Sequence, residues 1–507
     1  MPVFQAAEHE WGCPATGPAL LLRRLPVRRH PRGLMLAGAT ALVALLALPA
    51  AAFAQATPRP EIGPEKPFNP PPRVERTLPN GLRVVTVRYA TVPKATAVLT
   101  IESGLSVDPA ERAGLAQFVA DAAQEGTTSR DSEQIKREVF GMGASLTAFA
   151  GQDSATFQMR GLVETLPSMI GILADVTMNP TFPEDEIALM KARTEQQLQA
   201  QLASPQYVNN REFRQALFGD HPYSRIGVTQ ASLPNITRDA IAAYHQTYYR
   251  PNNAFLLVVG DVAPEAVFEA ATKAFGGWER GEVPPEKAPE MPTLKGRHLV
   301  FVQRPNSVQS SISVGNFSIK RDDQRWYTLQ LANQIFGGAF DSRLVRNIRE
   351  EKGYTYSPGS IFQSMEDAGL YRAVADVRND VTGATLTEIY KEIDALRQAG
   401  PQTEELADAK QYARGLFVLQ NATQNGLAGT LNTVNTFGLP KDYPETFQKQ
   451  ISQPSAEAVK TGAQMLLGSE NSVVVIVGDY PKVKDQLTGF TDITFVGLDG
   501  KPIPEPK

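Results

Sequence analysis

The sequence predicts an α+β fold made of two homologous halves, and two observations predict it. Strand-like segments are interleaved with segments that carry helix caps and helical spacing of apolar side chains. An apolar strand ending in Gly-Asp also occurs twice, over residues 255–261 and 473–479, and the strand–turn–Asp–helix segment near Asp108 recurs near Asp322. These matches lie at similar offsets on either side of a Pro-rich stretch, so they indicate a duplicated unit of about 210 residues.

The first half opens with a turn at Asn80-Gly81 and two predicted strands, over 82–87 and 95–102. Asp108 is followed directly by proline and, three residues on, by glutamate, which is typical of a capped helix start. We therefore expect a helix from Asp108 to about residue 125.

The remaining elements follow the same two patterns. Strands are expected over 146–161, 254–259, 299–303, 312–317 and 473–477. Helices are expected over 164–178, 184–203, 324–336 and 342–352. The last of these helices ends at Gly353, and Tyr356 is expected in a strand that follows it.

Composition and charge place the chain among folded soluble proteins. Its 507 residues are 42% hydrophobic and 21% charged, which is normal for globular domains. Without residues 1–54 the chain has 45 basic and 52 acidic side chains, a net charge of −7. This mild acidity argues against nucleic acid as a partner and favours basic peptides as ligands.

The N-terminal segment predicts export. Five arginines precede an apolar run over residues 34–48, and Ala52-Phe53-Ala54 follows. This order is typical of a secretory signal, so cleavage is expected after Ala54. The alternative is a membrane anchor, but the run is shorter than the ~20 residues that a span needs. The only cysteine, Cys13, lies in this signal, and an exported chain without cysteines is typical of a bacterial periplasm.

One helical segment carries a resemblance to a known family. Residues 114–121 read Gly-Leu-Ala-Gln-Phe-Val-Ala-Asp. Together with the supporting stretches, this segment resembles the insulinase/pitrilysin-type metallopeptidases, whose zinc motif is H-x-x-E-H. The supporting stretches, in order, are residues 78–82, 219–223, 248–251 and the two Gly-Asp strand ends. The resemblance covers residues 78–479 and implies halves that are each a mostly antiparallel sheet with helices on one face, facing each other across a chamber.

The chemical positions of the zinc motif are degenerate here. Gln117, Ala120 and Asp121 stand where active relatives have His, Glu and His. Zinc needs two imidazoles at i and i+4, and a carboxylate between them must take the proton of the metal-bound water. The region of the family's third ligand, residues 191–199, offers only Glu195, and no two histidines of the mature chain have metal-binding spacing. We expect this chain to bind no metal and no cofactor, and we interpret Gln117 and Asp121 as ordinary residues beside a packed helix face.

A second motif is retained. Residues 340–357 resemble the family segment S-R-L…L-R-E…G-x-x-Y-S, in which an Arg and a Tyr seven positions apart bind the substrate backbone and steady the oxyanion. Those positions fall on Arg349 and Tyr356, and a guanidinium and a phenol are suitable donors for a developing negative oxygen. The structural alternative is an Arg neutralised by Glu350 or Glu351 and a Tyr packed in a core.

The predicted map of the chain has six segments. They are a signal peptide at 1–54, a Pro-rich tether at 55–74, an N-terminal peptidase-like domain with the degenerate motif at 75–278, a linker at 279–296, a C-terminal peptidase-like domain with the Arg/Tyr pair at 297–496, and a tail at 497–507.

In some family members one subunit carries H-x-x-E-H and the other completes its site with the Arg/Tyr pair. This chain resembles the second type, so the leading hypothesis is a non-catalytic subunit of a periplasmic heterodimeric zinc peptidase. It would bind peptide or unfolded protein, with the zinc held by a homologous partner that has an intact H-x-x-E-H. Two alternatives stay open: a non-enzymatic peptide-binding or scaffold protein, and a peptidase that works alone through a rearranged metal site.

Overall fold

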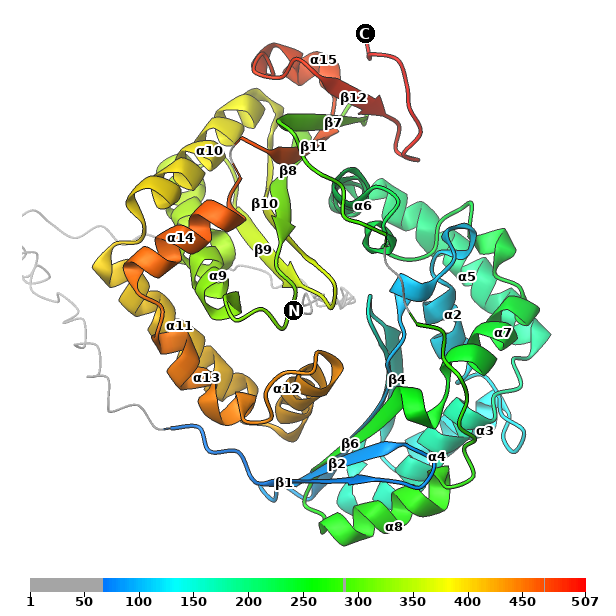
Figure 1. Ribbon diagram of the computed structural model, residues 1–507. Helices are drawn as coiled ribbons and strands as arrows, with labels where there is room; N and C mark the ends of the chain where they lie inside the picture. The colour runs from blue at the N-terminus through cyan, green and yellow to red at the C-terminus, as the bar shows by residue number, and fades with distance from the viewer. Residues whose placement is uncertain (1–66, 286–288, 469) are drawn as a thin grey trace, which may run out of the picture. The chain divides into compact units, whose positions relative to one another are not determined.

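Two six-stranded sheets carry the fold (Figure 1). The computed structural model describes residues 67–285, 289–468 and 470–507, so the predicted signal peptide lies outside the described residues. The first sheet has the order β1-β2-β6-β3-β5-β4 and the second β12-β7-β11-β8-β10-β9. The strands of the first sheet, in chain order, are β1 Arg73–Thr77, β2 Arg83–Arg88, β3 Lys94–Ile101, β4 Ser145–Ala150, β5 Ala155–Leu162 and β6 Ala254–Gly260. Those of the second are β7 Arg297–Gln303, β8 Gln309–Ser318, β9 Gly359–Ser364, β10 Gly369–Arg378, β11 Ser472–Gly478 and β12 Ile493–Val496.

The two sheets repeat one topology, which confirms the predicted duplication. In each, a parallel pair (β2 with β6, β7 with β11) is continued by three antiparallel strands. The apolar strands that first indicated duplication are β6 and β11, and every residue in both is buried. A continuous apolar run suits a strand that is covered on both faces. The sheets differ at one edge, where β1 pairs antiparallel to β2 but β12 pairs parallel to β7.

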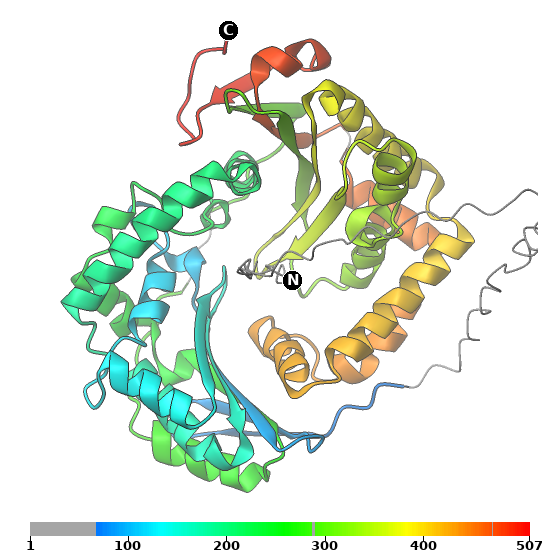
Figure 2. The ribbon, with the colours of Figure 1, turned by 180° about the vertical axis from the view of Figure 1, so that it is seen from behind.

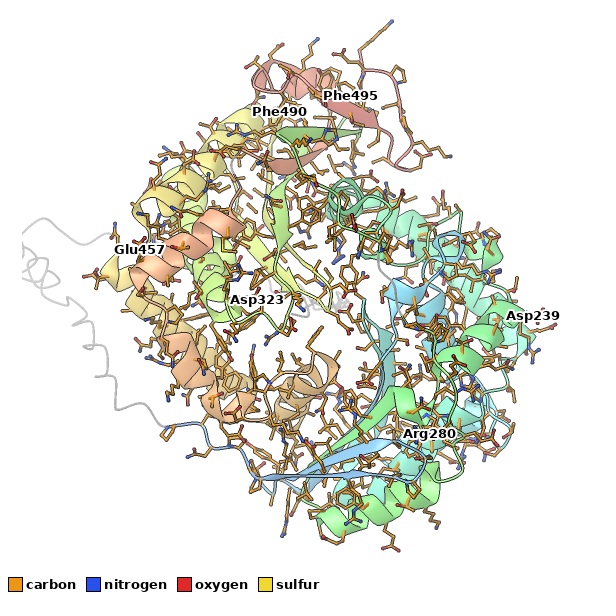
Figure 3. The ribbon with its side chains drawn as sticks, viewed as in Figure 1. Asp239, Arg280, Asp323, Glu457, Phe490 and Phe495 are labelled. Carbon is orange, nitrogen blue, oxygen red and sulfur yellow. The ribbon has the colours of Figure 1, made fainter. Side chains whose placement is uncertain are left out.

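Helices cover the outer face of each sheet, as expected, and Figure 2 shows the same layers from behind. The helices of the first half are α2 Leu115–Ala122, α3 Ser132–Gly141, α4 Leu166–Met178, α5 Glu184–Ala203, α6 Pro205–Phe218, α7 Arg238–Tyr248 and α8 Pro264–Phe275. Those of the second are α9 Trp326–Asn333, α10 Thr382–Ala399, α11 Thr403–Gln420, α12 Gln424–Thr436, α13 Tyr443–Ser452, α14 Ala456–Leu466 and α15 Tyr480–Val483, with π-helical turns at Gln334–Gly338 and Val345–Glu351. Charged residues on outer helices, such as Asp239 and Glu457, point away from the core (Figure 3).

One helix of each half also packs against the sheet of the other half. Helix α6 packs its apolar face against β7 and β11 of the second sheet, where Phe213 lies among buried valines. Asn209 on α6 donates to the carbonyls of Ser311 and Val475 at 2.8 and 3.2 Å. Helix α12 packs Leu427 and Leu431 against the first sheet in the same way. The inner face of each sheet is therefore partly covered by a helix of the opposite half, which adds to the predicted arrangement of helices on one face.

Three predicted elements were wrong in detail. No continuous helix starts at Asp108: the chain makes short 3₁₀ turns, and α2 begins only at Leu115. The stretch 146–161 is not one strand but the hairpin β4–β5, because Gly151 donates to the carbonyl of Ser154 and turns the chain back. Tyr356 lies in a loop, since β9 begins only at Gly359, after a proline that cannot donate to a sheet.

In the described part of the chain, no helix combines the length and the apolar character that a membrane span requires.

Candidate functional site

Helix α2 carries the degenerate motif, and the fold satisfies its polar groups internally. The buried carboxylate of Asp108 caps the helix, accepting from the backbone N–H groups of Gly114 at 2.8 Å and Ala116 at 2.9 Å. Gln117 donates to Asp121 Oδ1 at 2.8 Å, and its Oε1 accepts from the backbone N–H of Ala150 on β4 at 2.8 Å. The Gln117 amide therefore ties the helix to the edge strand of the first sheet.

The remaining motif positions are equally structural. Ala120 is fully buried, as are Leu115, Phe118 and Val119 on the same helix, so the predicted packed face of α2 is confirmed. Burial raises the pKa of Asp121 to about 6; the hydrogen bond from Gln117 opposes this shift and the nearby Glu125 adds to it. Burial likewise raises the pKa of Asp108 to about 7, against the two backbone hydrogen bonds that it accepts.

The residues present do not fit a zinc ion. A Gln amide is a poor zinc ligand, Ala120 has no basic group, and Asp121 alone cannot hold a metal. Glu195 is an exposed residue of α5. Within residues 67–285, 289–468 and 470–507, no group of three or more His, Cys, Asp or Glu side chains could hold a metal ion.

The histidines of the described residues have structural contacts instead. His245 Nε2 lies 2.8 Å from the carbonyl oxygen of Thr177, and burial lowers the pKa of this imidazole to about 4, so it is neutral and donates. His221 is buried and accepts from the backbone N–H of Tyr223 through Nδ1 at 3.1 Å. His298 Nδ1 lies 3.8 Å from Asp492.

A cavity of about 640 Å³ lies beside the motif, and both halves line it. From the first half come α2, the end of β4 and the helices α5 and α6; from the second come β9 and β10. Strands β4 and β9 are the last in their sheets and pair on one side only. Residues of both strands, including Phe149 and Ile361, line the cavity. Two free strand edges therefore border one cavity.

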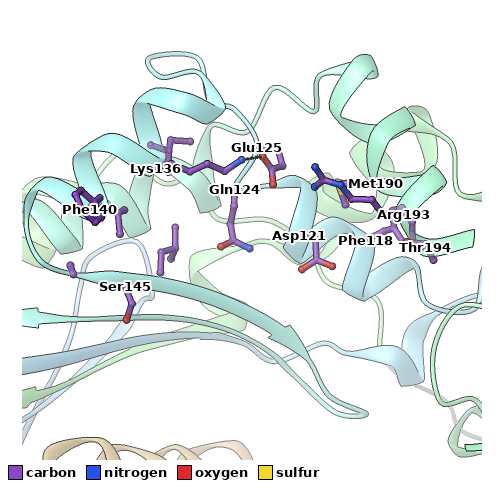
Figure 4. A pocket seen from close by; sticks show the side chains of 14 residues that line it. Phe118, Asp121, Gln124, Glu125, Lys136, Phe140, Ser145, Met190, Arg193 and Thr194 are labelled. Atoms are coloured by element: carbon purple, nitrogen blue, oxygen red, sulfur yellow. Dashed lines mark hydrogen bonds and ion pairs between the residues drawn. The ribbon is translucent and has the colours of Figure 1, made fainter. Parts of the chain in front are cut away.

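A second cavity of about 570 Å³ lies within the first half, between α2, α3, α5 and β4 (Figure 4). Its wall is mostly apolar, with Phe118, Val139 and Met190 among its residues. An ion pair of Lys136 and Glu125 at 2.9 Å lies at its rim. Asp121 lines both cavities.

Arg349 and Tyr356 lie elsewhere, on the surface of the second half. Arg349 is at the end of the π-helical turn Val345–Glu351, whose apolar stripe of Leu344, Val345 and Ile348 is buried as predicted. Its guanidinium lies 4.7 Å from the ring centroid of Phe340, which is itself 69% exposed. Tyr356 is 88% exposed. Neither residue lines the two cavities.

The structural alternative for this pair does not hold. Among the described residues Arg349 forms no ion pair, with Glu350, Glu351 or any other carboxylate. Tyr356 is not packed in a core. Tyr356 is accessible and Arg349 is half-buried, and the catalytic interpretation stays a prediction.

Sequence reasoning missed two arginines in the wall of the larger cavity, Arg214 on α6 and Arg372 on β10. Arg372 gave no signal of its own, because it occupies the polar phase of an alternating strand, as Asp376 and Arg378 do. Arg214 gave none, because α6 was not predicted and its docking on the second sheet is a tertiary property.

Comparison with known proteins connects this chain to zinc peptidases. Residues 83–228 match the family described as Insulinase (Peptidase family M16), and residues 235–412 match the one described as Peptidase M16 inactive domain. A Rickettsia felis protein named as an uncharacterized zinc protease is 25% identical over 404 residues, 79% of this chain and 96% of that protein. An uncharacterized zinc protease of Bacillus subtilis is 24% identical over 352 residues, 69% of this chain and 84% of its own length.

Two solved structures share the fold. A peptidase M16 inactive domain from Pseudomonas fluorescens superposes with a TM-score of 0.75 at 26% identity and covers 80% of this chain and 98% of its own. A protease from Helicobacter pylori superposes with a TM-score of 0.76 at 19% identity, covering 80% and 99%; this second likeness concerns the fold alone. The resemblance and the two-halved fold predicted from the sequence are confirmed.

Proposed function

The chain belongs to the insulinase family of peptidases, peptidase family M16, and we propose that it is the non-catalytic subunit of a periplasmic heterodimeric zinc peptidase. In this role it binds peptide and supplies Arg349 and Tyr356 in trans to the zinc site of a homologous partner. The zinc ion and the general base belong to that partner, which carries an intact H-x-x-E-H.

The accessible Tyr356 and the guanidinium of Arg349, which has no ion-pair partner among the described residues, carry this proposal. Tyr356 is 88% exposed, and Arg349, which is half-buried, lies against the exposed ring of Phe340. Uncommitted donors of this kind at a surface are accessible to a second chain. Aimed at a tetrahedral intermediate, a guanidinium and a phenol O–H stabilise the oxyanion that forms when water attacks the peptide bond.

The larger cavity supports peptide binding. An extended peptide can add itself as a strand to a free sheet edge, because its backbone groups satisfy those of the edge strand. Strand β9 offers such an edge at the cavity, whereas on β4 the N–H of Ala150 already donates to Gln117. No group of three or more His, Cys, Asp or Glu side chains among the described residues could hold a metal ion, and our proposal is therefore that this chain binds the peptide and leaves its cleavage to the partner.

The test is reconstitution. The mature chain, beginning at residue 55, is purified alone and together with a homologous chain of the same genome that has an intact H-x-x-E-H, and cleavage of an unstructured peptide is measured. Only the pair should cleave. Arg349→Ala and Tyr356→Phe in this chain should each lower kcat by about 10²–10³-fold, the usual cost of removing one oxyanion donor.

Two control variants make the same chemical changes at other exposed sites. Arg346→Ala lies one turn earlier on the same helical segment, and Tyr412→Phe changes an exposed tyrosine of α11. Both should leave kcat unchanged. Complex formation is followed by gel filtration, so that loss of the dimer is not mistaken for loss of chemistry. Equal rates for the partner alone and for the pair would refute the trans-acting role.

The second candidate is a peptide-binding or scaffold protein with no catalytic partner. The internally satisfied motif on α2 favours it, because Gln117 and Asp121 serve the fold and not a reaction. Under this alternative the mature chain binds peptide, but it does not raise the rate at which any homologous chain cleaves peptide.

A further inference from the structure

We infer that Arg372 and Arg214 form an anion site in the wall of the larger cavity, where they bind a carboxylate of the peptide, either an acidic side chain or a free C-terminus. This inference rests on the proposed peptide-binding function and names a feature of the peptides bound.

The site exists only where the two halves meet. Arg372 lies on β10 of the second half, and Arg214 lies on α6, which the first half lends to the second sheet. Both line the cavity of about 640 Å³. Phe213, the neighbour of Arg214 on α6, is fully buried, and the Arg372 guanidinium lies 5.8 Å from the centroid of its ring.

The two guanidinium groups differ in how they are held. Arg214 is 4% exposed and donates to the carbonyl oxygen of Tyr223 at 2.7 Å and to Gln363 Oε1 at 2.9 Å. Arg372 has only its contact with the Phe213 ring, and it makes no hydrogen bond or ion pair with any residue in the described part of the chain. Its donors are therefore uncommitted, and they lie at a cavity.

The charges around the pair are unbalanced. Burial lowers the pKa of Arg372 and of Arg214 to about 10, and the mutual repulsion of the two cations contributes for Arg214. Both stay charged at neutral pH. Asp153, the carboxylate that favours the charged form of Arg214, accepts from Tyr223 Oη at 2.5 Å and from the N–H of Glu366 at 3.2 Å.

No carboxylate offsets Arg372. Among the described residues that line the cavity the charged groups are Arg214, Arg372 and Asp121, and Asp121 accepts from Gln117. The other polar side chains of the wall are neutral amides and hydroxyls. A desolvated cation without a counter-ion costs free energy, so a ligand that brings an anion recovers that cost. A carboxylate matches the planar fork of a guanidinium with two parallel hydrogen bonds.

The strand register gives the peptide a way to reach the pair. Arg372 lies directly opposite Ile361 on β9, the edge strand. A peptide added to β9 would place one residue opposite Ile361, two strand spacings or ~10 Å from the Arg372 backbone, and extended Glu and Arg side chains span that distance. The local charge thus favours acidic peptides, whereas the net charge of the whole chain had favoured basic ones.

The test measures binding of fluorescently labelled peptides to the mature chain by anisotropy. One sequence is made with Glu or Gln at a central position, each with a free or an amidated C-terminus. The two carboxylate sources are thereby separated. A peptide with the recognised carboxylate should bind about 10-fold more tightly than its neutral counterpart, as expected for a charge-assisted pair.

Arg372→Gln should abolish this preference and leave the Kd of the neutral peptide unchanged. The matched control is Arg378→Gln, which removes an exposed arginine at the end of the same strand, where it pairs with Asp380; it should keep the preference. Arg372→Lys keeps the charge without the planar fork and should retain part of the preference.

Stability separates a binding role from a structural one. The unfolding midpoint of Arg372→Gln should not fall, since the variant removes a buried cation that has no counter-ion. A fall in the midpoint together with loss of all peptide binding would assign Arg372 to the fold and overturn the inference. Equal affinity of wild type for all four peptides would also overturn it and leave the proposed function standing. Absence of binding to every peptide would refute the proposed function itself.

Discussion

Helix α2 in the first half and the segment around Arg349 and Tyr356 in the second were both recognised from the same family pattern, yet the fold treats them differently. On α2 the polar motif positions are bonded to each other and to the backbone of β4. In the second half the tyrosine is 88% exposed, and the arginine contacts an exposed ring. The polar groups on α2 are held by hydrogen bonds within the fold, whereas the pair proposed to act on another chain forms no ion pair or hydrogen bond among the described residues.

The comparison implies that changes near α2 affect stability and that changes to the Arg/Tyr pair do not. The largest expected effect is that of Gly114→Ala at the start of α2. Gly114 has a φ of 88°, and a Cβ there would lie 2.5 Å from the backbone N and 2.8 Å from the Cα of Val228. Left-handed strain and overpacking together should lower the free energy of unfolding by about 2–5 kcal/mol, measured by denaturant titration.

Gly171→Ala is the matched control, because it lies within helix α4 with no atom within 4 Å of the added Cβ. It should raise stability by about 0.4–1 kcal/mol. If both variants unfolded at the same denaturant concentration, the close contact between Gly114 and Val228 would not contribute to the stability of the fold.

The next effect is that of Gln117→Ala. The substitution leaves the buried N–H of Ala150 without its acceptor and Asp121 without its donor. An orphaned buried polar group should cost about 1–3 kcal/mol in the free energy of unfolding. Gln197→Ala, an exposed glutamine of α5 beside the same cavity, should stay within about 0.5 kcal/mol of wild type. An unchanged midpoint for Gln117→Ala would mean that the motif position is not structural.

The smallest effect on stability is expected for Arg349→Ala and Tyr356→Phe. Tyr356 is exposed, Arg349 is half-buried, and neither side chain forms a hydrogen bond within the described residues, so each variant should unfold within about 0.5 kcal/mol of wild type. The measurement is the same denaturant titration, on the purified chain. A loss as large as that of Gln117→Ala would remove the contrast between the two regions and weaken the case for a role in trans.

Much of the fold was accessible to sequence reasoning, for physical reasons that are local. Strands β6 and β11 are continuous apolar runs buried on both sides, and such runs are recognisable wherever they occur. Helix α5 begins and ends at the predicted residues. Its first turn contains three acidic side chains, whose negative charges interact favourably with the positive end of the helix dipole. The duplication was inferred from these two strands together with the similar segments near Asp108 and Asp322.

The three errors have different causes. Asp108 has every local feature of a helix cap, but it caps a helix that starts seven residues later. The stretch 146–161 contains the turn-forming residues Gly151, Asp153 and Ser154, and a hydrogen bond from the Gly151 N–H to the Ser154 carbonyl closes the turn between β4 and β5. Tyr356 follows a helix and precedes a strand, and residue pattern alone does not say to which side of that boundary it belongs.

The candidate sites divide in the same way. The residue pattern determined that the zinc motif is degenerate and that an Arg and a Tyr are retained, because these are statements about which side chains are present at which spacing. Only the tertiary structure decided that Gln117 serves β4, that two free strand edges border one cavity, and that Arg214 and Arg372 share its wall. Those two arginines are 158 positions apart, and the docking of α6 on the opposite sheet is what brings them together. The balance of charge in a cavity depends on which distant segments enclose it, and for this reason it cannot be inferred from either segment alone.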